Sequence, residues 1–140
     1  MSAIPPLLKR KLRTEFLQPR WAYCHSLEAL LGIPLEADHI STTARKGRTI
    51  FSNLCLCCRA CNGFKADRLQ AHDPFTGRLV PLFHPRKQDW SAHFYWSDDS
   101  TQIIGLSATG RATVAALKMN NDLITNLRSL WVILQMHPRD

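Results

Sequence analysis

The chain has 140 residues, 45% of them hydrophobic, and its 18 Lys and Arg against 11 Asp and Glu give a formal charge of +7. This size and apolar content suit one core, so we expect a single domain over residues 1–140. Apolar runs fall short of the roughly 20 residues that cross a bilayer, and the N-terminal residues lack a signal-peptide pattern, so we expect a cytoplasmic protein without a membrane partner. The charge favours a polyanion such as nucleic acid, although an indifferent basic surface would carry the same charge.

The first third of the chain predicts a helix and then a strand. Residues 6–17 predict a short basic amphipathic helix, because Leu8, Leu12 and Phe16 recur at helical spacing. A proline then ends this helix, and LEADHI at 35–40 favours a short strand.

A loop, a second strand and a second helix are expected next. Residues 42–52 are polar and basic and contain a glycine, which is typical of a loop. NLCLC at 53–57 alternates in the manner of a strand, and RACNGFKADRL at 59–69 predicts a turn into a short helix with Lys65 and Arg68 exposed. The middle of the chain is therefore strand, loop, strand, helix.

The second half predicts short strands or wrapping loops and then helices. A Pro-Phe-Thr-Gly turn follows Asp73, and an aromatic stretch covers 90–96. One or two helices are expected from about Thr113, divided near residues 120–122, because apolar residues recur at positions 114, 117, 124, 127, 131 and 134.

The five cysteines are crowded, because four of them lie within seven residues. This arrangement is poor disulfide architecture, and neighbouring thiols in a reducing compartment more often bind metal, carry redox chemistry or pack as small apolar groups. Cys55 and Cys57 lie two apart on the expected strand and share one face, so we interpret them as core residues. The other three are Cys24, Cys58 and Cys61.

One segment resembles the HNH, or ββα-metal, endonuclease family. The resemblance rests on Asp38-His39-Ile40, on Asn53-Leu54, and on Cys58-Arg59-Ala60-Cys61-Asn62 with Lys65 after it, and it spans roughly residues 20–68. The separations, 14 residues from His39 to Asn53 and 9 more to Asn62, match that motif, with Asn in place of its final His. The resemblance implies an α+β fold with a ββα-metal core of about 20–68, an N-terminal basic helix and a C-terminal helical extension of about 69–140.

The resemblance also implies metal-dependent hydrolysis of nucleic acid. Cleaving a phosphodiester requires a base for water and a divalent cation for the phosphate and leaving oxygen. His39 would be the general base, and Asp38 and Asn62 would hold Mg²⁺ or Mn²⁺ through oxygen atoms. Asn53 would orient the imidazole or brace the loop between the strands. DNA is the expected substrate, with RNA remaining open.

Many members of this family hold a structural Zn²⁺ with two Cys-x-x-Cys pairs. Here the second pair is intact as Cys58 and Cys61, but Trp21 stands where a cysteine would precede Cys24. A tetrahedral site therefore lacks one ligand, which His25 or water could supply, or the site could be empty with Trp21 packed in its place.

The residues after 69 resemble the C-terminal extension of stand-alone bacterial HNH proteins. Their dense aromatic and histidine residues invite a base-stacking or metal interpretation, but additional core is the better one, with His84 and His93 hydrogen-bonded nearby. The residues concerned are His84, Trp90, His93, Phe94 and Trp96.

Basic residues near the motif are candidates for phosphate contacts, although each could equally be a solvated surface charge. They are Arg45, Lys46, Arg48, Lys65 and Arg68, with Arg86 and Lys87 further away.

Two alternatives to an endonuclease remain open. One is a catalytically inactive, zinc-knuckle-like module that binds nucleic acid. The other is a structural or regulatory protein whose basic surface meets an acidic partner. Oligomeric state and sequence specificity leave no pattern in the chain.

Overall fold

The computed structural model describes residues 4–15, 20–32 and 34–138, and the chain divides into two compact units. The first unit comprises the residues up to 69 together with 84–89, and the second comprises 70–83 and the residues from 90 onward. The expectation of one domain over the whole chain therefore stays a prediction. In the described residues, no helix is both long and apolar enough to cross a membrane.

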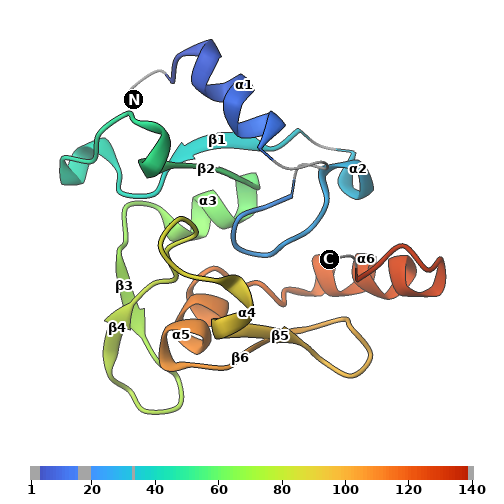
Figure 1. The fold of residues 1–140 in the computed structure, drawn as a ribbon. Helices are drawn as coiled ribbons and strands as arrows, with labels where there is room; N and C mark the ends of the chain where they lie inside the picture. Colours follow the sequence, from blue (N-terminus) through green and yellow to red (C-terminus); the bar gives the residue numbers. More distant parts are fainter. Residues whose placement is uncertain (1–3, 16–19, 33, 139–140) are drawn as a thin grey trace. The chain divides into compact units, whose positions relative to one another are not determined.

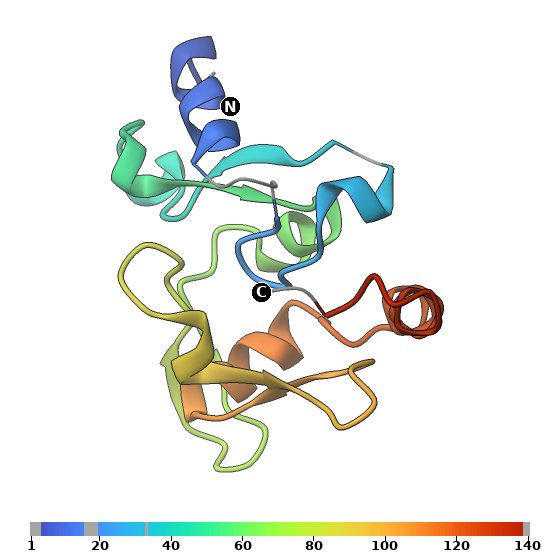
Figure 2. The same ribbon diagram turned by 45° about the vertical axis from the view of Figure 1, so that its right-hand side comes forward.

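The first unit is built around an antiparallel hairpin of two short strands. Asp38 lies opposite Cys55 and His39 opposite Leu54 in the register of β1 and β2. Helix α1 lies on one side of this hairpin and helix α3 on the other (Figures 1 and 2). The elements are α1 (Pro6–Thr14), α2 (Glu28–Leu31), β1 (Glu36–His39), β2 (Leu54–Cys57) and α3 (Arg59–Lys65).

The α+β, ββα arrangement agrees with the sequence pattern. A helix on each side of the hairpin explains why all four residues of β2 are buried, Cys55 and Cys57 included. The predicted basic helix is present as α1, which begins with prolines and buries Leu12. Its expected continuation over Phe16 and Leu17 lies outside the described residues.

The loop between the strands contains two single turns of 3₁₀-helix, Thr43–Arg45 and Phe51–Asn53. After β2, Cys58 caps the N-terminus of α3, because its Sγ accepts a hydrogen bond of 3.0 Å from the Cys61 N–H. The predicted loop, second strand and turn into a helix are therefore confirmed.

The second unit packs two hairpins with helices. Its core consists of apolar and aromatic side chains such as Phe83, Phe94, Ile103 and Leu117. His93 lies in this unit with its Nδ1 2.6 Å from the Ser107 hydroxyl, which supports the structural interpretation of the aromatic stretch. The elements are β3 (Gln70–His72), β4 (Leu79–Pro81), α4 (Trp90–His93), β5 (Phe94–Trp96), β6 (Ile103–Gly105), α5 (Ala108–Ala116) and α6 (Asp122–Ile133).

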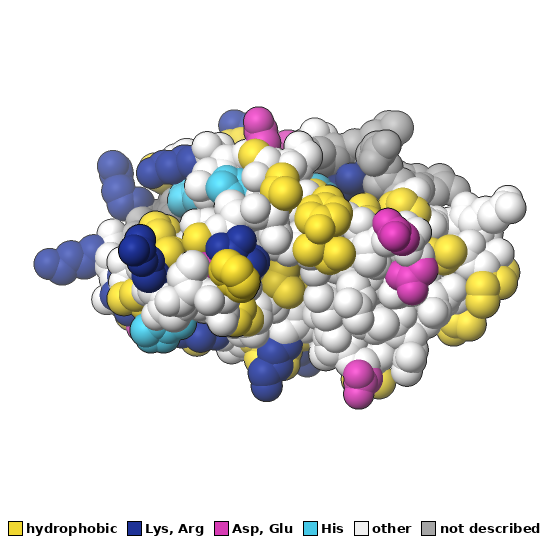
Figure 3. All heavy atoms as spheres, turned by 90° about the horizontal axis from the view of Figure 1, so that it is seen from below, with side chains coloured by type: hydrophobic (Ala, Val, Ile, Leu, Met, Phe, Trp, Pro, Cys, Tyr) yellow, Lys and Arg dark blue, Asp and Glu magenta, His cyan; other side chains and the backbone are white. Residues whose placement is uncertain are grey.

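The two expected C-terminal helices are present, but the expected start of the first is wrong. Helix α5 begins at Ala108 rather than near Thr113, because Ser107 caps it by accepting a hydrogen bond from the Gly110 N–H. Helix α6 buries Ile124, Arg128 and Trp131, whereas Leu127 and Leu134 of the predicted apolar set are exposed. Hydrophobic side chains reach the surface elsewhere too, as the yellow spheres of Figure 3 show.

Candidate functional site

Asp38 and His39 lie at the C-terminal end of β1, on opposite faces of the strand. Burial raises the pKa of the Asp38 carboxyl, and a hydrogen bond from the His39 N–H and the charge of Lys65 oppose this shift. His39 is buried, with only 7% of the residue exposed, and its Nε2 lies 2.9 Å from the hydroxyl oxygen of Thr49. The imidazole is therefore held by the loop between the strands.

Asn53 braces that loop. Its Oδ1 accepts a hydrogen bond from the Ser41 N–H, and its Nδ2 donates to the carbonyl oxygens of Ser41 and Arg48, over 2.8 to 2.9 Å. The Ile40 N–H in turn donates to the Asn53 carbonyl oxygen. Of the two roles expected for Asn53, the contacts favour bracing the loop.

Asn62 and Lys65 lie three residues apart in α3 and so share a face of that helix. The Lys65 ammonium reaches the end of β1, where its Nζ donates to the Ile40 carbonyl oxygen over 2.7 Å. The charges of Asp38 and Lys65 lie close enough to affect each other, and Lys65 is only 2% exposed. The expectation of an exposed Lys65 is therefore wrong, because its ammonium group is buried and donates a hydrogen bond from α3 to the residue after β1.

The other basic candidates differ in how far they are free to meet a phosphate. Lys46 and Arg48 are exposed on the inter-strand loop. Arg45 is exposed but donates to the Asp67 carbonyl oxygen, and Arg68 donates to the carbonyl oxygens of Phe64 and Lys65 at the end of α3. Arg86, further away, donates to the Leu54 carbonyl oxygen and pairs with a glutamate.

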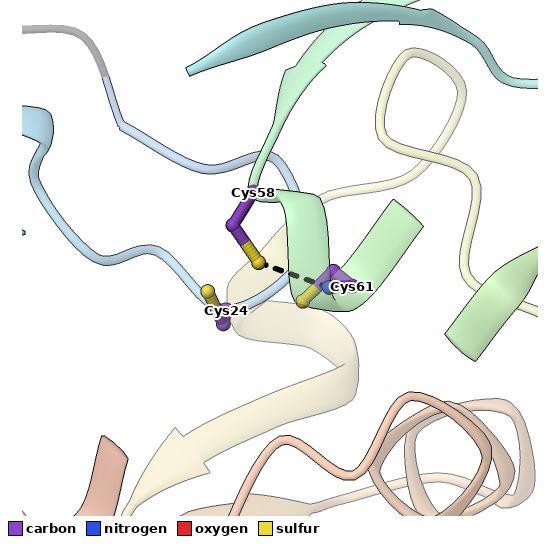
Figure 4. A group of neighbouring side chains, drawn as sticks. All are labelled: Cys24, Cys58 and Cys61. Carbon is purple, nitrogen blue, oxygen red and sulfur yellow. Dashed lines mark hydrogen bonds between the residues drawn. The ribbon is translucent and has the colours of Figure 1, made fainter. Parts of the chain in front are cut away.

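Cys24, Cys58 and Cys61 gather in the first unit, and their Sγ atoms all lie within 4.8 Å of one another. Figure 4 shows Cys24 on the segment before β1 and the other two at the start of α3, with the three sulfur atoms directed toward one another. All five cysteines are free thiols, and all five are buried. Three soft donors at this spacing fit a thiophilic metal such as Zn²⁺.

The three thiols of this cluster share hydrogen bonds and so influence one another's protonation. Burial alone would raise the pKa of the Cys24 thiol, but hydrogen bonds from Cys58, Cys61 and Ser26 together hold it well below its usual value. A hydrogen bond to Cys24 raises the pKa of Cys58 to about 12 and also raises that of Cys61.

His25 is not part of the cysteine group in the described residues. Burial lowers the pKa of its imidazole to about 4, and its backbone has a φ of +54°. Trp21 is 9% exposed, so its indole is buried in the same unit. The cluster therefore offers three thiols that could hold a metal ion, and the contacts do not support His25 as a fourth ligand.

The sequence pattern missed Thr49 and the burial of Lys65. Thr49 is one of several polar residues in an expected loop, and nothing in its spacing marks it as a partner of His39. The position of Lys65 three residues after Asn62 did signal a shared helix face, but its spacing alone did not show whether that face was buried.

The β1–β2 hairpin and helix α3 form a ββα unit of the kind found in ββα-metal domains. Asp38 and His39 lie at the end of β1, and Asn62 lies in α3. In comparison with known families, the HNH endonuclease model matches residues 22–68. Residues 22–68 are therefore similar to the HNH endonuclease family, and the rest of the chain lies outside the match. No curated protein and no solved structure matches the chain.

Proposed function

We propose that this protein is a metal-dependent endonuclease that hydrolyses phosphodiester bonds of DNA. His39 is the general base, Asp38 and Asn62 hold a divalent cation, and Asn53 keeps the loop around His39 in place. The observation that carries the proposal is the link between α3 and the end of β1, where Lys65 reaches Ile40 and lies near Asp38. Because Asn62 shares a helix face with Lys65, it lies on the side of α3 that meets this end of β1.

The donor set suits a hard cation. A carboxylate oxygen and an amide oxygen are ligands that Mg²⁺ and Mn²⁺ accept, and both side chains are half-buried rather than sealed in the core. When bound, the cation would neutralise charge on the phosphate and the leaving oxygen. His39 would take a proton from the attacking water.

The exposed Lys46 and Arg48 support a role in holding the substrate backbone, because they lie on the loop that also carries Thr49. Arg45 and Arg68 have backbone partners, but each keeps part of its surface open and stays in the proposed phosphate-binding set. We propose DNA rather than RNA as the substrate because the similarity to HNH endonucleases suggests it. The free thiols fit a reducing compartment such as the cytoplasm.

The cysteine cluster is proposed as a structural zinc site. Cys24 comes from the segment before β1, and Cys58 and Cys61 come from the start of α3. A bound Zn²⁺ would therefore link these two segments of the unit. Water is the expected fourth ligand, since His25 lies outside the group.

A nicking assay on supercoiled plasmid tests the catalytic proposal. We expect wild-type protein to nick with Mg²⁺ or Mn²⁺, EDTA to stop the reaction, and His39→Ala and Asn62→Ala each to lower the rate by at least about 100-fold. An exposed change, Lys9→Ala, is the matched control and leaves the rate unchanged. Absence of nicking with every divalent cation, in folded protein that still binds plasmid, would contradict the proposal.

The second candidate function is nucleic-acid binding without cleavage. It is favoured by the burial of His39, since only 7% of that residue is exposed to water. It predicts the same retardation of DNA by the wild-type protein and by His39→Ala, with no dependence on Mg²⁺.

A further inference from the structure

We propose that Thr49 is a positioning residue for His39, and that its hydroxyl occupies Nε2 so that Nδ1 is the nitrogen that accepts the proton of water. The inference rests on the proposed function and names a residue that the HNH motif does not include. The Nε2 and Oγ1 atoms lie 2.9 Å apart, and His39 and Thr49 are ten residues apart in the chain. The contact thus joins the end of β1 to the loop that follows it.

The loop places Thr49 through contacts on both sides. Asn53 holds the carbonyl oxygen of Arg48, the residue directly before Thr49, and both backbone groups of Ser41 near the start of the loop. Gly47 lies so close to the chain at Ser41 that an added Cβ would be 1.8 Å from the Ser41 carbonyl oxygen. The hydroxyl of Thr49 therefore comes from a braced loop rather than from a free one.

The contact has a consequence for the proton on the ring. A neutral imidazole carries one proton, and the Thr49 hydroxyl can either accept a hydrogen bond from Nε2 or donate one to it, so the 2.9 Å contact fits both tautomers. We assign the proton to Nε2. With the proton on Nε2 donated to Oγ1 of Thr49, Nδ1 has the lone pair that a general base needs.

The resulting step balances without another group. Water gives its proton to Nδ1, its oxygen forms a bond to phosphorus, and the bond from phosphorus to the leaving oxygen breaks. The Nε2–H remains hydrogen-bonded to Oγ1 of Thr49 throughout, so the imidazolium that forms keeps this hydrogen bond. The leaving oxygen takes a proton from solvent, and His39 returns its proton to solvent afterwards.

Three variants separate positioning from simple loop stability. Thr49→Val removes the hydroxyl while keeping the shape, Thr49→Ser keeps a hydroxyl, and Thr43→Val makes the same change at an exposed position of the same loop. We expect Thr49→Val to lower kcat by about 10- to 100-fold with little change in KM for an oligonucleotide duplex. Thr49→Ser should recover most of the loss, and Thr43→Val should match the wild type.

A second readout does not depend on activity. In ¹⁵N-histidine-labelled protein, the His39 ring signals are assigned by their loss in His39→Gln, and their shifts report which nitrogen carries the proton. We expect Nε2–H in the wild type and in Thr49→Ser, and a mixture of tautomers in Thr49→Val. A wild-type Nδ1–H tautomer, or a Thr49→Val enzyme with wild-type kcat, overturns the inference. A wild-type protein that does not nick overturns the proposed function instead, while the tautomer still decides the assignment of Thr49.

Discussion

The Nζ atom of Lys65 donates a hydrogen bond to the carbonyl oxygen of Ile40 over 2.7 Å, across the interface between α3 and the end of β1. The residue that receives this bond directly follows His39. A lysine that sequence patterns assign to the DNA surface therefore connects the two elements that carry the proposed metal ligands.

Replacing Lys65 by Met should destabilise the first unit, because the buried carbonyl of Ile40 loses the hydrogen bond that the Lys65 ammonium donates to it. We expect the free energy of unfolding to fall by about 1–3 kcal/mol, measured by urea denaturation. Lys46→Met, at an exposed position of the same unit, is the control and should change little. Equal stability of the two variants would show that the Lys65 bond contributes nothing net.

Gly47 should not tolerate a side chain. Because a Cβ there would lie 1.8 Å from a backbone oxygen, Gly47→Ala must displace the loop, at a cost of about 1–3 kcal/mol. Gly63→Ala is the matched change, since a Cβ in the middle of α3 meets nothing within 4 Å and should stabilise by about 0.5–1 kcal/mol. Thermal unfolding of the two variants should shift in opposite directions, and the same sign for both would contradict the close approach at Gly47.

If the cysteine cluster is the zinc site, bound zinc should depend on Cys24, Cys58 and Cys61 and not on the other two cysteines. Protein purified without chelator should contain one equivalent of Zn²⁺ by elemental analysis. Cys58→Ser should lose the metal and lower Tm, because a metal that binds only the folded state stabilises that state. Cys57→Ser, at a buried thiol outside the group, should keep it. Equal zinc in the two variants would exclude the cluster as the site.

Phosphate contacts by the inter-strand loop predict a change in the salt dependence of binding. Lys46→Ala and Arg48→Ala should each reduce the slope of log K against log salt concentration by about 0.9, the value for one lost phosphate contact. Fluorescence anisotropy with a labelled duplex measures the slope. Arg10→Ala, exposed on α1, should leave it unchanged, and a shift of equal size in that variant would point to charge alone.

In the second unit, Asp73 predicts acid-sensitive stability. Two hydrogen bonds from Arg111 hold the pKa of the Asp73 carboxyl well below its usual value. Because the carboxylate is favoured in the folded state, its contribution is present above the ordinary pKa of about 3.9 and is lost as pH falls toward the lowered one. Asp73→Asn should therefore lower Tm at pH 7, with the difference shrinking below about pH 4. Asp98→Asn, at an exposed position, should change Tm at neither pH.

The sequence alone determined the ββα core, because its signals are local. Strand, loop and helix patterns lie within one continuous segment. The spacing of His39, Asn53 and Asn62 indicated the HNH family, whose model matches residues 22–68. The three metal-capable cysteines followed from the same segment and its upstream neighbour.

Tertiary structure decided which of the predicted charges and apolar residues are buried. Lys65 is buried because a backbone carbonyl 25 residues away accepts its hydrogen bond, and Thr49 meets His39 because Asn53 holds the loop between them. In α6, periodicity marked apolar positions, but the burial of Arg128 and the exposure of Leu134 depend on what packs against each face. Hydrogen-bond partners from distant segments leave no trace in local spacing, and this is why the sequence predicted the motif but not its supporting contacts.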